Sequence, residues 1–444
     1  MIGELDADAV AGYFRGKSIL ITGSTGFLGK VLVEKILRVQ PDVKKLFLLI
    51  RAAGVESAKH RVETEVTGRE IFQVLKEKHG DRFDDFIQEK VCPLAGDIVY
   101  KNLGLDHAKL TELSKGIDII VNGAATTNFY ERYDVAFDTN VMGAKHICEF
   151  AKRCNKLKML LHVSTAYVAG EQEGILPEKP FLLGETLREG VHLDIESELN
   201  LIQETRREVE ANCYSERVEK RTMKELGLKR TIDSFIIGYA KQALSIFLVD
   251  LDLIMDVVPG DMVVNAMMVA MAVHSEDQAQ SIYHVTSSLR NPAPYAVLVD
   301  SGGRYFLHNP PCSKKNGEPV RLSRMRFFRT LPRFRAYMAV KFRLPLEILR
   351  LLNIALFGAF SRRYGELSRK YRYVMHVAEL YAPYALFKGC FDDTNTERLR
   401  AALKANKEQN KSRGYDFGFD PKSVDWDNYF YSVHIPGVVK YLCD

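Results

Sequence analysis

The stretch SILITGSTGFLG, residues 18–29, decides the fold. Its apolar first half, Ser18–Gly23, predicts a buried strand, and the residues VLVEKIL beyond it have helical spacing. In this spacing Gly23 permits a tight turn, Gly26 lets the backbone approach a pyrophosphate, and Gly29 lets the helix pack on the strand. The N-terminus of the helix attracts the phosphates. Glycines alone indicate a tight turn, but between a strand and a helix they favour dinucleotide binding. The predicted cofactor-binding residues here are Thr22, Gly23, Ser24, Thr25, Gly26, Phe27, Leu28 and Gly29.

Four more short apolar runs follow along the chain. Their apolar residues do not alternate with polar ones, which indicates strands buried on both faces, and helical or charged segments follow most of them. This order predicts an α/β fold with a doubly wound, parallel, Rossmann-type sheet. The four runs are Lys45–Arg51, Val91–Asp97, Asp118–Ala125 and Met159–Thr165.

Polar and small residues at the ends of these runs are candidates for the cofactor site. Sites that prefer NAD usually place an acidic residue where Arg51 ends the second run, whereas arginine suits a 2′-phosphate. The sequence therefore favours NADPH, with a solvent-facing arginine as the alternative. Asp97, followed by Ile98, is a candidate for the adenine edge, although a turn or helix cap would use the same residue. In the NGAATT turn we expect contacts from Asn122, Ala124, Ala125 and Thr126.

Composition excludes several classes of protein. The chain has 444 residues, of which 46% are hydrophobic and 27% charged, and its net charge of +5 does not indicate nucleic-acid binding. Its 7 cysteines are scattered without a CxxC pair, which is typical of reduced thiols and predicts neither disulfides nor a metal site. The N-terminal residues resemble neither a secretory signal nor a transit peptide. No run reaches the ~18 apolar residues of a membrane span, and the nearest is Leu351–Phe360.

The second half of the chain changes character several times. A charged helical pattern runs over Asp194–Leu226 with Gly227 as its stop, and a sheet-like pattern returns over Ser245–Ser288. A basic stretch, Lys314–Arg343, is interleaved with phenylalanines, and beyond about residue 345 the pattern is helical. The basic stretch has three interpretations: contacts to coenzyme A phosphates, an anionic membrane surface with the phenylalanines inserted, or a solvated face over a packed helix.

Several motifs resemble those of one enzyme family. GSTGFLGKVLVEKILR, VNGAATTNFYERYDVAFDTNVMGAKHICEFAKRC, LLHVSTAYVAGEQEG and VDWDNYFYSVHIPGVVKY are similar to plant-type fatty acyl-CoA reductases, which are extended short-chain dehydrogenase/reductases. TIDSFIIGYAKQ, DVVPGDMVVNAM and YALFKGCFDDTNTERL carry the same resemblance. It implies a nucleotide-binding domain over 1–300, a basic helical region over 301–365 and a C-terminal reductase-associated domain over 366–444.

The resemblance also implies a chemistry. Such enzymes use two NADPH to reduce a long-chain acyl-CoA to a primary alcohol by way of an aldehyde. Thr165 would hold the carbonyl oxygen with Ser164 beside it, and a Tyr-x-x-x-Lys pair on the following helix would donate the proton. The product is lipid-soluble, so the expected location is the cytoplasm or the cytosolic face of the endoplasmic reticulum, with peripheral membrane association as one alternative.

The segment that should carry the tyrosine and lysine is missing from the pattern. The chain reads KELGLKRTIDSF, so a helix–strand unit of several tens of residues is absent at 229–231. Tyr239 and Lys241 are substitute candidates, but a spacing of two turns them to different sides of a helix. Three chance matches to the motif are Tyr13–Lys17, Tyr337–Lys341 and Tyr384–Lys388, and Tyr167 is interpreted as a packing residue.

Three hypotheses about activity therefore remain. The chain is an active reductase with an improvised proton donor, or it is a catalytically impaired, NADP-binding variant such as a skipped-exon product. The third is a different short-chain reductase, a ketone reductase or epimerase, against which the C-terminal motifs argue.

Overall fold

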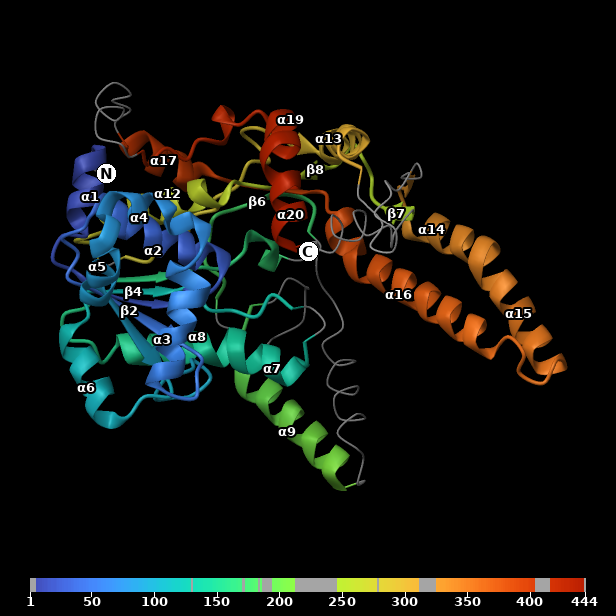
Figure 1. The fold of residues 1–444 in the computed structure, drawn as a ribbon, viewed down its shortest axis with the longest axis horizontal. Helices are drawn as coiled ribbons and strands as arrows, with labels where there is room; N and C mark the ends of the chain where they lie inside the picture. Colours follow the sequence, from blue (N-terminus) through green and yellow to red (C-terminus); the bar gives the residue numbers. More distant parts are fainter. Residues whose placement is uncertain are drawn as a thin grey trace.

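Five parallel strands form the central sheet of the computed structural model (Figure 1). They are β1 (Ser18–Thr22), β2 (Lys45–Ile50), β3 (Val91–Ala95), β4 (Ile119–Asn122) and β5 (Met159–His162), in the order β3-β2-β1-β4-β5. The five predicted strands and the doubly wound α/β class are confirmed. The structure describes residues 5–128, 131–169, 172–182, 184–185, 194–211, 246–277, 279–310, 325–403 and 416–442.

Helices cover both faces of this sheet. Ile19 and Ile21 of β1 face a core shared with α1 (Ala7–Tyr13), α2 (Phe27–Val39) and α12 (Gly260–Val273). Leu20 points to the opposite core, shared with α6 (His107–Gly116) and α8 (Gly143–Ala151). Each such side chain, once buried, contributes about 1.5–3 kcal/mol, which is why the strands carry apolar residues on both faces.

Short helices fill the connections of the first half. Between β2 and β3 lie α3 (Val55–Val62), η1 (Glu63–Thr67), η2 (Glu70–Phe72), α4 (Gln73–His79), η3 (Gly80–Arg82) and α5 (Phe83–Lys90). After β4 come α7 (Tyr133–Phe137) and η4 (Asp138–Met142), and after β5 come η5 (Ala166–Ala169), β6 (Gly174–Leu176) and α9 (Ile195–Ala211). The predicted helix from Asp194 is thus confirmed as far as Ala211. Its remainder, Gly227 and the junction at 229–231 lie outside the described residues.

The sheet-like pattern predicted over Ser245–Ser288 is wrong for most of its length. Within its described residues, 246–277 and 279–288, the strands are β7 (Ile246–Leu248) and β8 (Ile254–Met255). They pair with β10 (Arg326–Phe328) and β9 (Ala293–Pro294) outside the central sheet. The larger part is the helix α12, which is buried almost all round. A helix buried on every side has a continuous apolar sequence, and periodicity alone does not separate it from a buried strand.

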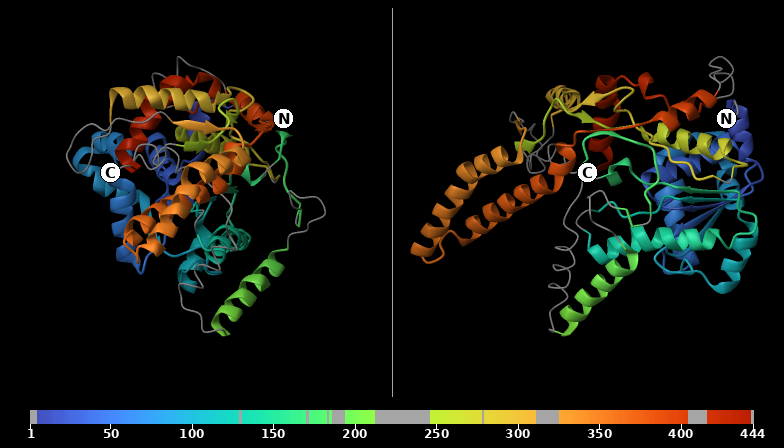
Figure 2. Two further views of the ribbon diagram at one scale, coloured as in Figure 1. Left: turned by 90° about the vertical axis from the view of Figure 1, so that its right-hand side faces the viewer. Right: turned by 180° about the vertical axis from the view of Figure 1, so that it is seen from behind.

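The C-terminal third is helical, as predicted beyond residue 345. Its elements are α13 (Tyr295–His308), α14 (Leu331–Met338), η6 (Ala339–Arg343), α15 (Leu344–Ala355), α16 (Ser361–Ala385), β11 (Gly389–Phe391), α17 (Thr394–Ala402), η7 (Pro421–Ser423), α19 (Trp426–Tyr429), η8 (Phe430–His434) and α20 (Ile435–Leu442). Figures 1 and 2 show α14, α15 and α16 projecting from the body as a hairpin. Among the described residues, no helix is both long and apolar enough to cross a bilayer.

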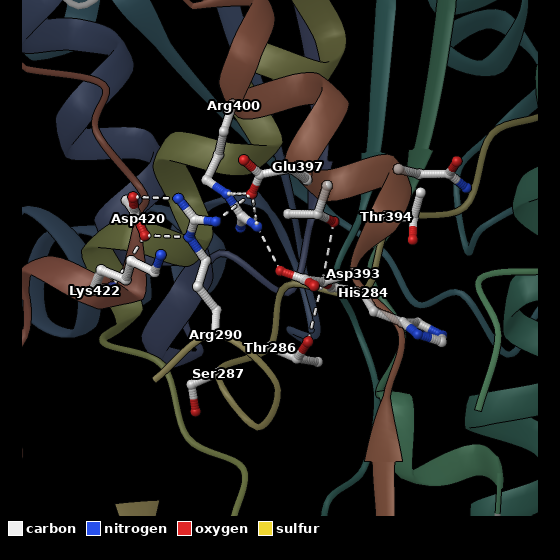
Figure 3. A network of polar contacts seen from close by, with 12 residues as sticks. His284, Thr286, Ser287, Arg290, Asp393, Thr394, Glu397, Arg400, Asp420 and Lys422 are labelled. Atoms are coloured by element: carbon white, nitrogen blue, oxygen red, sulfur yellow. Dashed lines mark hydrogen bonds and ion pairs between the residues drawn. The ribbon is translucent and has the colours of Figure 1, made fainter. Parts of the chain in front are cut away.

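The end of the chain packs back onto its middle. β11 pairs in parallel with β6, and Glu178 accepts hydrogen bonds from the backbone N–H groups of Asn395 and Thr396 at the start of α17. Figure 3 shows a second tie, in which Arg290 contacts Asp420 at 2.6 Å and Glu397 at 2.7 Å. The division at residues 300 and 365 stays a prediction.

Candidate functional site

The glycine turn between β1 and α2 is held by close backbone contacts. Gly23 has a φ of 74°, and a Cβ atom there would lie 2.5 Å from the carbonyl oxygen of Gly123. A Cβ at Gly29 would collide with the Gly23 carbonyl. Both positions therefore require glycine, one for its conformation and both for space. The turn stands at the point where the strand order reverses, with β2 on one side of β1 and β4 on the other.

Ser24 has an unsatisfied hydroxyl inside this turn. The residue is fully buried, and its Oγ has no hydrogen-bond partner among the described residues. A buried hydroxyl without a partner costs about 1–3 kcal/mol, so this group suits a ligand whose oxygen atoms accept a hydrogen bond from it. The residues of the turn therefore fit a dinucleotide phosphate.

A buried hydrogen-bond chain ties three strand ends together. The Thr22 hydroxyl donates to Asn122 Oδ1 at 2.7 Å and accepts from the Ala124 N–H at 3.1 Å. The Asn122 amide nitrogen lies 3.0 Å from His162 Nδ1 at the end of β5. The side chains of Thr22 and Asn122 are thus used to align β1, β4 and β5.

The rest of the NGAATT turn is positioned by its backbone. Asn140 accepts from the Thr126 N–H at 2.8 Å and donates to the Thr126 carbonyl at 3.1 Å. This clamp from η4 holds the turn open, so that Ala125 is exposed and Ala124 half-buried. Sequence reasoning did not find Asn140, because the long motif that contains both residues does not show that a side chain 14 residues away bonds to the Thr126 backbone.

The candidates after β2 and β3 have different surroundings. Arg51 is exposed at the carboxyl end of β2, and its side chain has no hydrogen bond or ion pair within the described ranges. Asp97 is half-buried and accepts from the Val99 N–H at 3.2 Å, which is the turn role left open above. The Ile98 side chain is buried in the core, and its carbonyl oxygen lies 2.9 Å from His146 Nδ1, so its side chain faces away from solvent.

Ser164 and Thr165 follow β5 at the same edge of the sheet. Both are exposed, and Thr165 Oγ1 accepts a weak hydrogen bond from the Tyr167 N–H at 3.3 Å. The hydroxyl proton of Thr165 stays available to a ligand. Since carboxyl ends of neighbouring parallel strands meet at one edge, the structure brings together the glycine turn, the NGAATT turn and this hydroxyl pair.

Tyr167 is a packing residue, as interpreted from the sequence. Its ring contacts Tyr384, Phe387 and Phe391 with centroids 5.2–5.8 Å apart. Burial holds the pKa of Tyr167 far above its usual range, which makes it a poor proton donor.

The three chance motif pairs lie in other settings. Tyr13 belongs to α1, before β1 begins, so it lies toward the amino edge of the sheet, and burial raises its pKa to about 12. Lys341 stacks over the Tyr337 ring at 5.4 Å on the projecting hairpin. Lys388 pairs with Glu173 at 2.8 Å, and the Tyr384 ring packs on Tyr167. The substitute candidates Tyr239 and Lys241 lie outside the described residues.

The structure adds two features that sequence reasoning missed. The exposed ring of Phe27 lies against Gly260 at the start of α12, beside the glycine turn. Asp256 accepts from the Ser287 N–H at 2.8 Å and the Ser288 N–H at 3.3 Å, and burial raises its pKa. The PGD sequence, residues 259–261, marks the start of α12 but does not show that Phe27 lies against it, and no local pattern signals the Asp256 contacts.

Comparisons with known proteins agree on one family. A family model of an NAD-binding domain, described as male sterility protein, matches residues 21–226, and a second model with the same description matches residues 341–444. The chain is 42% identical to fatty acyl-CoA reductase 1 of Arabidopsis thaliana, over 97% of this chain and 98% of the relative. It is 37% identical to the alcohol-forming fatty acyl-CoA reductase of Simmondsia chinensis, with the same coverage.

The alignment with the Arabidopsis relative is longer than the part of this chain that it covers. It has 488 positions, whereas 97% of 444 residues is about 431, so about 57 positions have no residue in this chain.

Solved structures share the fold at low identity. The terminal reductase domain of the myxalamid pathway has a TM-score of 0.53 at 18% identity, over 98% of this chain and 95% of that one. A reductase domain of a Mycobacterium tuberculosis nonribosomal peptide synthetase has a TM-score of 0.53 at 19% identity, with 98% and 96% coverage. The family models, the identity to these relatives and the extended Rossmann-type fold agree. The chain belongs to the plant-type fatty acyl-CoA reductases, enzymes of the extended short-chain dehydrogenase/reductase family that use a nicotinamide cofactor.

Proposed function

We propose that this chain reduces a long-chain fatty acyl-CoA to a primary alcohol with NADPH, at the carboxyl edge of its central sheet. The main support is the position of three features at the ends of neighbouring strands. The glycine turn follows β1, the NGAATT turn follows β4, and the Ser164–Thr165 pair follows β5. Bound there, the cofactor supplies hydride. The thioester takes one hydride and one proton to give aldehyde and coenzyme A, and the aldehyde takes a second of each.

The protein's own groups would bind and orient. The Ser24 hydroxyl and the N-terminus of α2 would meet the pyrophosphate, and Arg51 would meet the 2′-phosphate. The Thr165 hydroxyl, oriented by the Tyr167 N–H, would donate to the substrate carbonyl oxygen with Ser164 beside it. A cytosolic site at the endoplasmic reticulum suits a lipid-soluble product.

A second candidate is a cofactor-binding variant with little turnover. Two observations favour it. The described Tyr384–Lys388 pair, whose tyrosine packs on Tyr167 near Thr165, has its lysine paired with Glu173, and about 57 alignment positions have no residue here. General acid catalysis typically speeds such a step by roughly 10²–10⁴-fold. Without a positioned tyrosine and lysine, this chain should be slower by about that factor than a reductase that has both.

The cofactor half of the proposal is tested by Arg51→Gln. Loss of a charged partner for the 2′-phosphate should weaken NADPH binding about tenfold or more and leave NADH binding unchanged, measured by nicotinamide fluorescence. Arg82→Gln, at an exposed arginine of η3, is the matched control. An equal loss for both cofactors would contradict the 2′-phosphate role.

Turnover separates the two candidates. NADPH oxidation with a panel of long-chain acyl-CoAs, abolished by Thr165→Val, supports the reductase. NADPH binding without oxidation supports the impaired variant. Turnover that Thr165→Val leaves intact would contradict the proposed role of Thr165.

A further inference from the structure

The outer half of the projecting hairpin presents an unusual surface. It is defined here as residues 340–373, which include α15, the connection after it and the first half of α16. α15 has the sequence LPLEILRLLNIA, yet none of its residues is buried. The right view of Figure 2 shows this part of the hairpin well away from the central sheet.

Its exposed residues are large and apolar. Leu344, Ile348 and Leu351 lie one or two turns apart along α15, so they form one stripe. Ile354 is 65% exposed, and Phe357, in the connection, is fully exposed. Phe357 also has a φ of 49°, a left-handed conformation that bulky residues rarely adopt. Contiguous apolar surface of this kind marks an interaction site.

The same segment is strongly basic. Residues 341–372 carry eight lysines and arginines against two glutamates, whereas the whole chain has a net charge of only +5. The two glutamates are paired within their helices, Glu347 with Arg350 at 2.8 Å and Glu366 with Arg362 at 3.3 Å. The other cations are Lys341, Arg343, Arg363, Arg369, Lys370 and Arg372, all exposed.

This surface lies mostly beyond Lys314–Arg343, the basic stretch for which the sequence left a membrane contact as one of three interpretations. The phenylalanines of the basic stretch do not face outward as expected for insertion: Phe334 is fully buried, and Phe327 and Phe328 pack into the body. Arg329 and Arg335 pair with Asp252 and Glu379. The described part of the stretch, 325–343, is therefore mostly a basic face over packed helices, and the exposed apolar residues lie beyond it.

We propose that the outer half of the hairpin docks on an anionic phospholipid bilayer, with α15 lying in the plane of the interface. The apolar stripe would meet the acyl boundary, the Phe357 ring would insert, and the arginine and lysine stems would lie along it with their charges at the headgroups. A second copy of the chain fits less well, because it would bring two basic rims together. This proposal rests on the exposed surface of residues 340–373 and does not depend on whether the cofactor site turns over substrate.

Vesicle flotation of the full chain tests the proposal. We expect binding to phosphatidylcholine vesicles with about 30 mol% phosphatidylserine, and at least tenfold weaker binding to pure phosphatidylcholine. I354S combined with F357G should reduce binding to the anionic vesicles about tenfold or more. The glycine suits the positive φ, so the fold should be retained, which circular dichroism checks. Leu307→Ser, at a residue 81% exposed on α13, is the control and should bind normally.

A fluorescent variant reports the geometry directly. Phe357→Trp adds one indole to a chain whose own tryptophan, Trp426, is buried, so a blue shift on adding anionic vesicles reports insertion of residue 357. Unchanged flotation of I354S with F357G, or no blue shift, would overturn the proposal. So would solution dimers that this double variant dissociates, since they would identify a second copy as the occupant.

Discussion

Lys35 carries a buried amino group that makes stability depend on pH. Burial lowers its pKa to about 8, and its Nζ donates to Asn265 and, at 2.6 Å, to the Asp416 carbonyl. The unfolded chain, with a pKa near 10.5, binds more protons than the folded chain between pH 8 and 10.5. The contribution of Lys35 to the free energy of unfolding should therefore rise with pH there, by at most about 1.4 kcal/mol per unit. Urea unfolding at pH 8, 9 and 10 measures it, and Lys35→Met should remove that rise. An unchanged slope in the variant would show that other groups cause it.

At the residue scale, sequence could predict the roles that depend on local chain geometry. Gly23 and Gly29 had to be glycine for space, and Arg51 stands at the strand end where the pattern put it. The bonds among Thr22, Asn122 and His162 could not be predicted, because they join residues 40 and 100 positions apart. Only strand order brings such residues together.

At the scale of single elements, α9 depends on few anchors. Ile202 is buried against Phe137, and Arg206 contacts the buried carboxylate of Asp134 at 2.6 Å. Ile202→Ala should loosen the helix by about 2 kcal/mol or more, and so raise tryptic cleavage at Arg206 and Arg207 roughly 30-fold. Leu201→Ala, at an exposed neighbour, should leave the cleavage rate unchanged. Equal rates in the two variants would refute the anchor.

The same scale explains which elements were predictable. The five strands were predictable, because each has an unbroken apolar run of the kind that burial on both faces selects, and β5 at the sheet edge keeps this run although none of its residues is buried. The helix α12 was not predictable, because a helix that is buried almost all round also has an unbroken apolar sequence. The hairpin was predicted as helix from residue 345, but its exposure was not, since a sequence does not show which apolar face lacks a neighbour.

At the scale of the whole molecule, contacts distant in sequence join the C-terminal segments to the body. Glu178 and Arg290 make their contacts with residues more than 100 positions away, and no local motif signalled either. Around Arg290, the Arg400 guanidinium also contacts Glu397 at 2.7 Å and Asp393, so two arginines and three carboxylates form one network (Figure 3). Such a network costs little only while every member keeps its partner.

Breaking this network should weaken the whole fold. Arg290→Met leaves Asp420 without the hydrogen bonds that lower its pKa to about 2, so the free energy of unfolding should fall by about 1–2 kcal/mol near neutral pH, discounted for the partial exposure of Asp420. Because that pKa is lowered from 3.8, the contribution is present above pH 3.8 and lost as pH falls toward 2. The variant should therefore lose less stability than the parent across this window in acid titrations. Arg335→Met removes an exposed ion pair with Glu379 and should change stability by less than about 1 kcal/mol. If the two variants unfold alike, the Arg290 network does not hold the C-terminal segments in place.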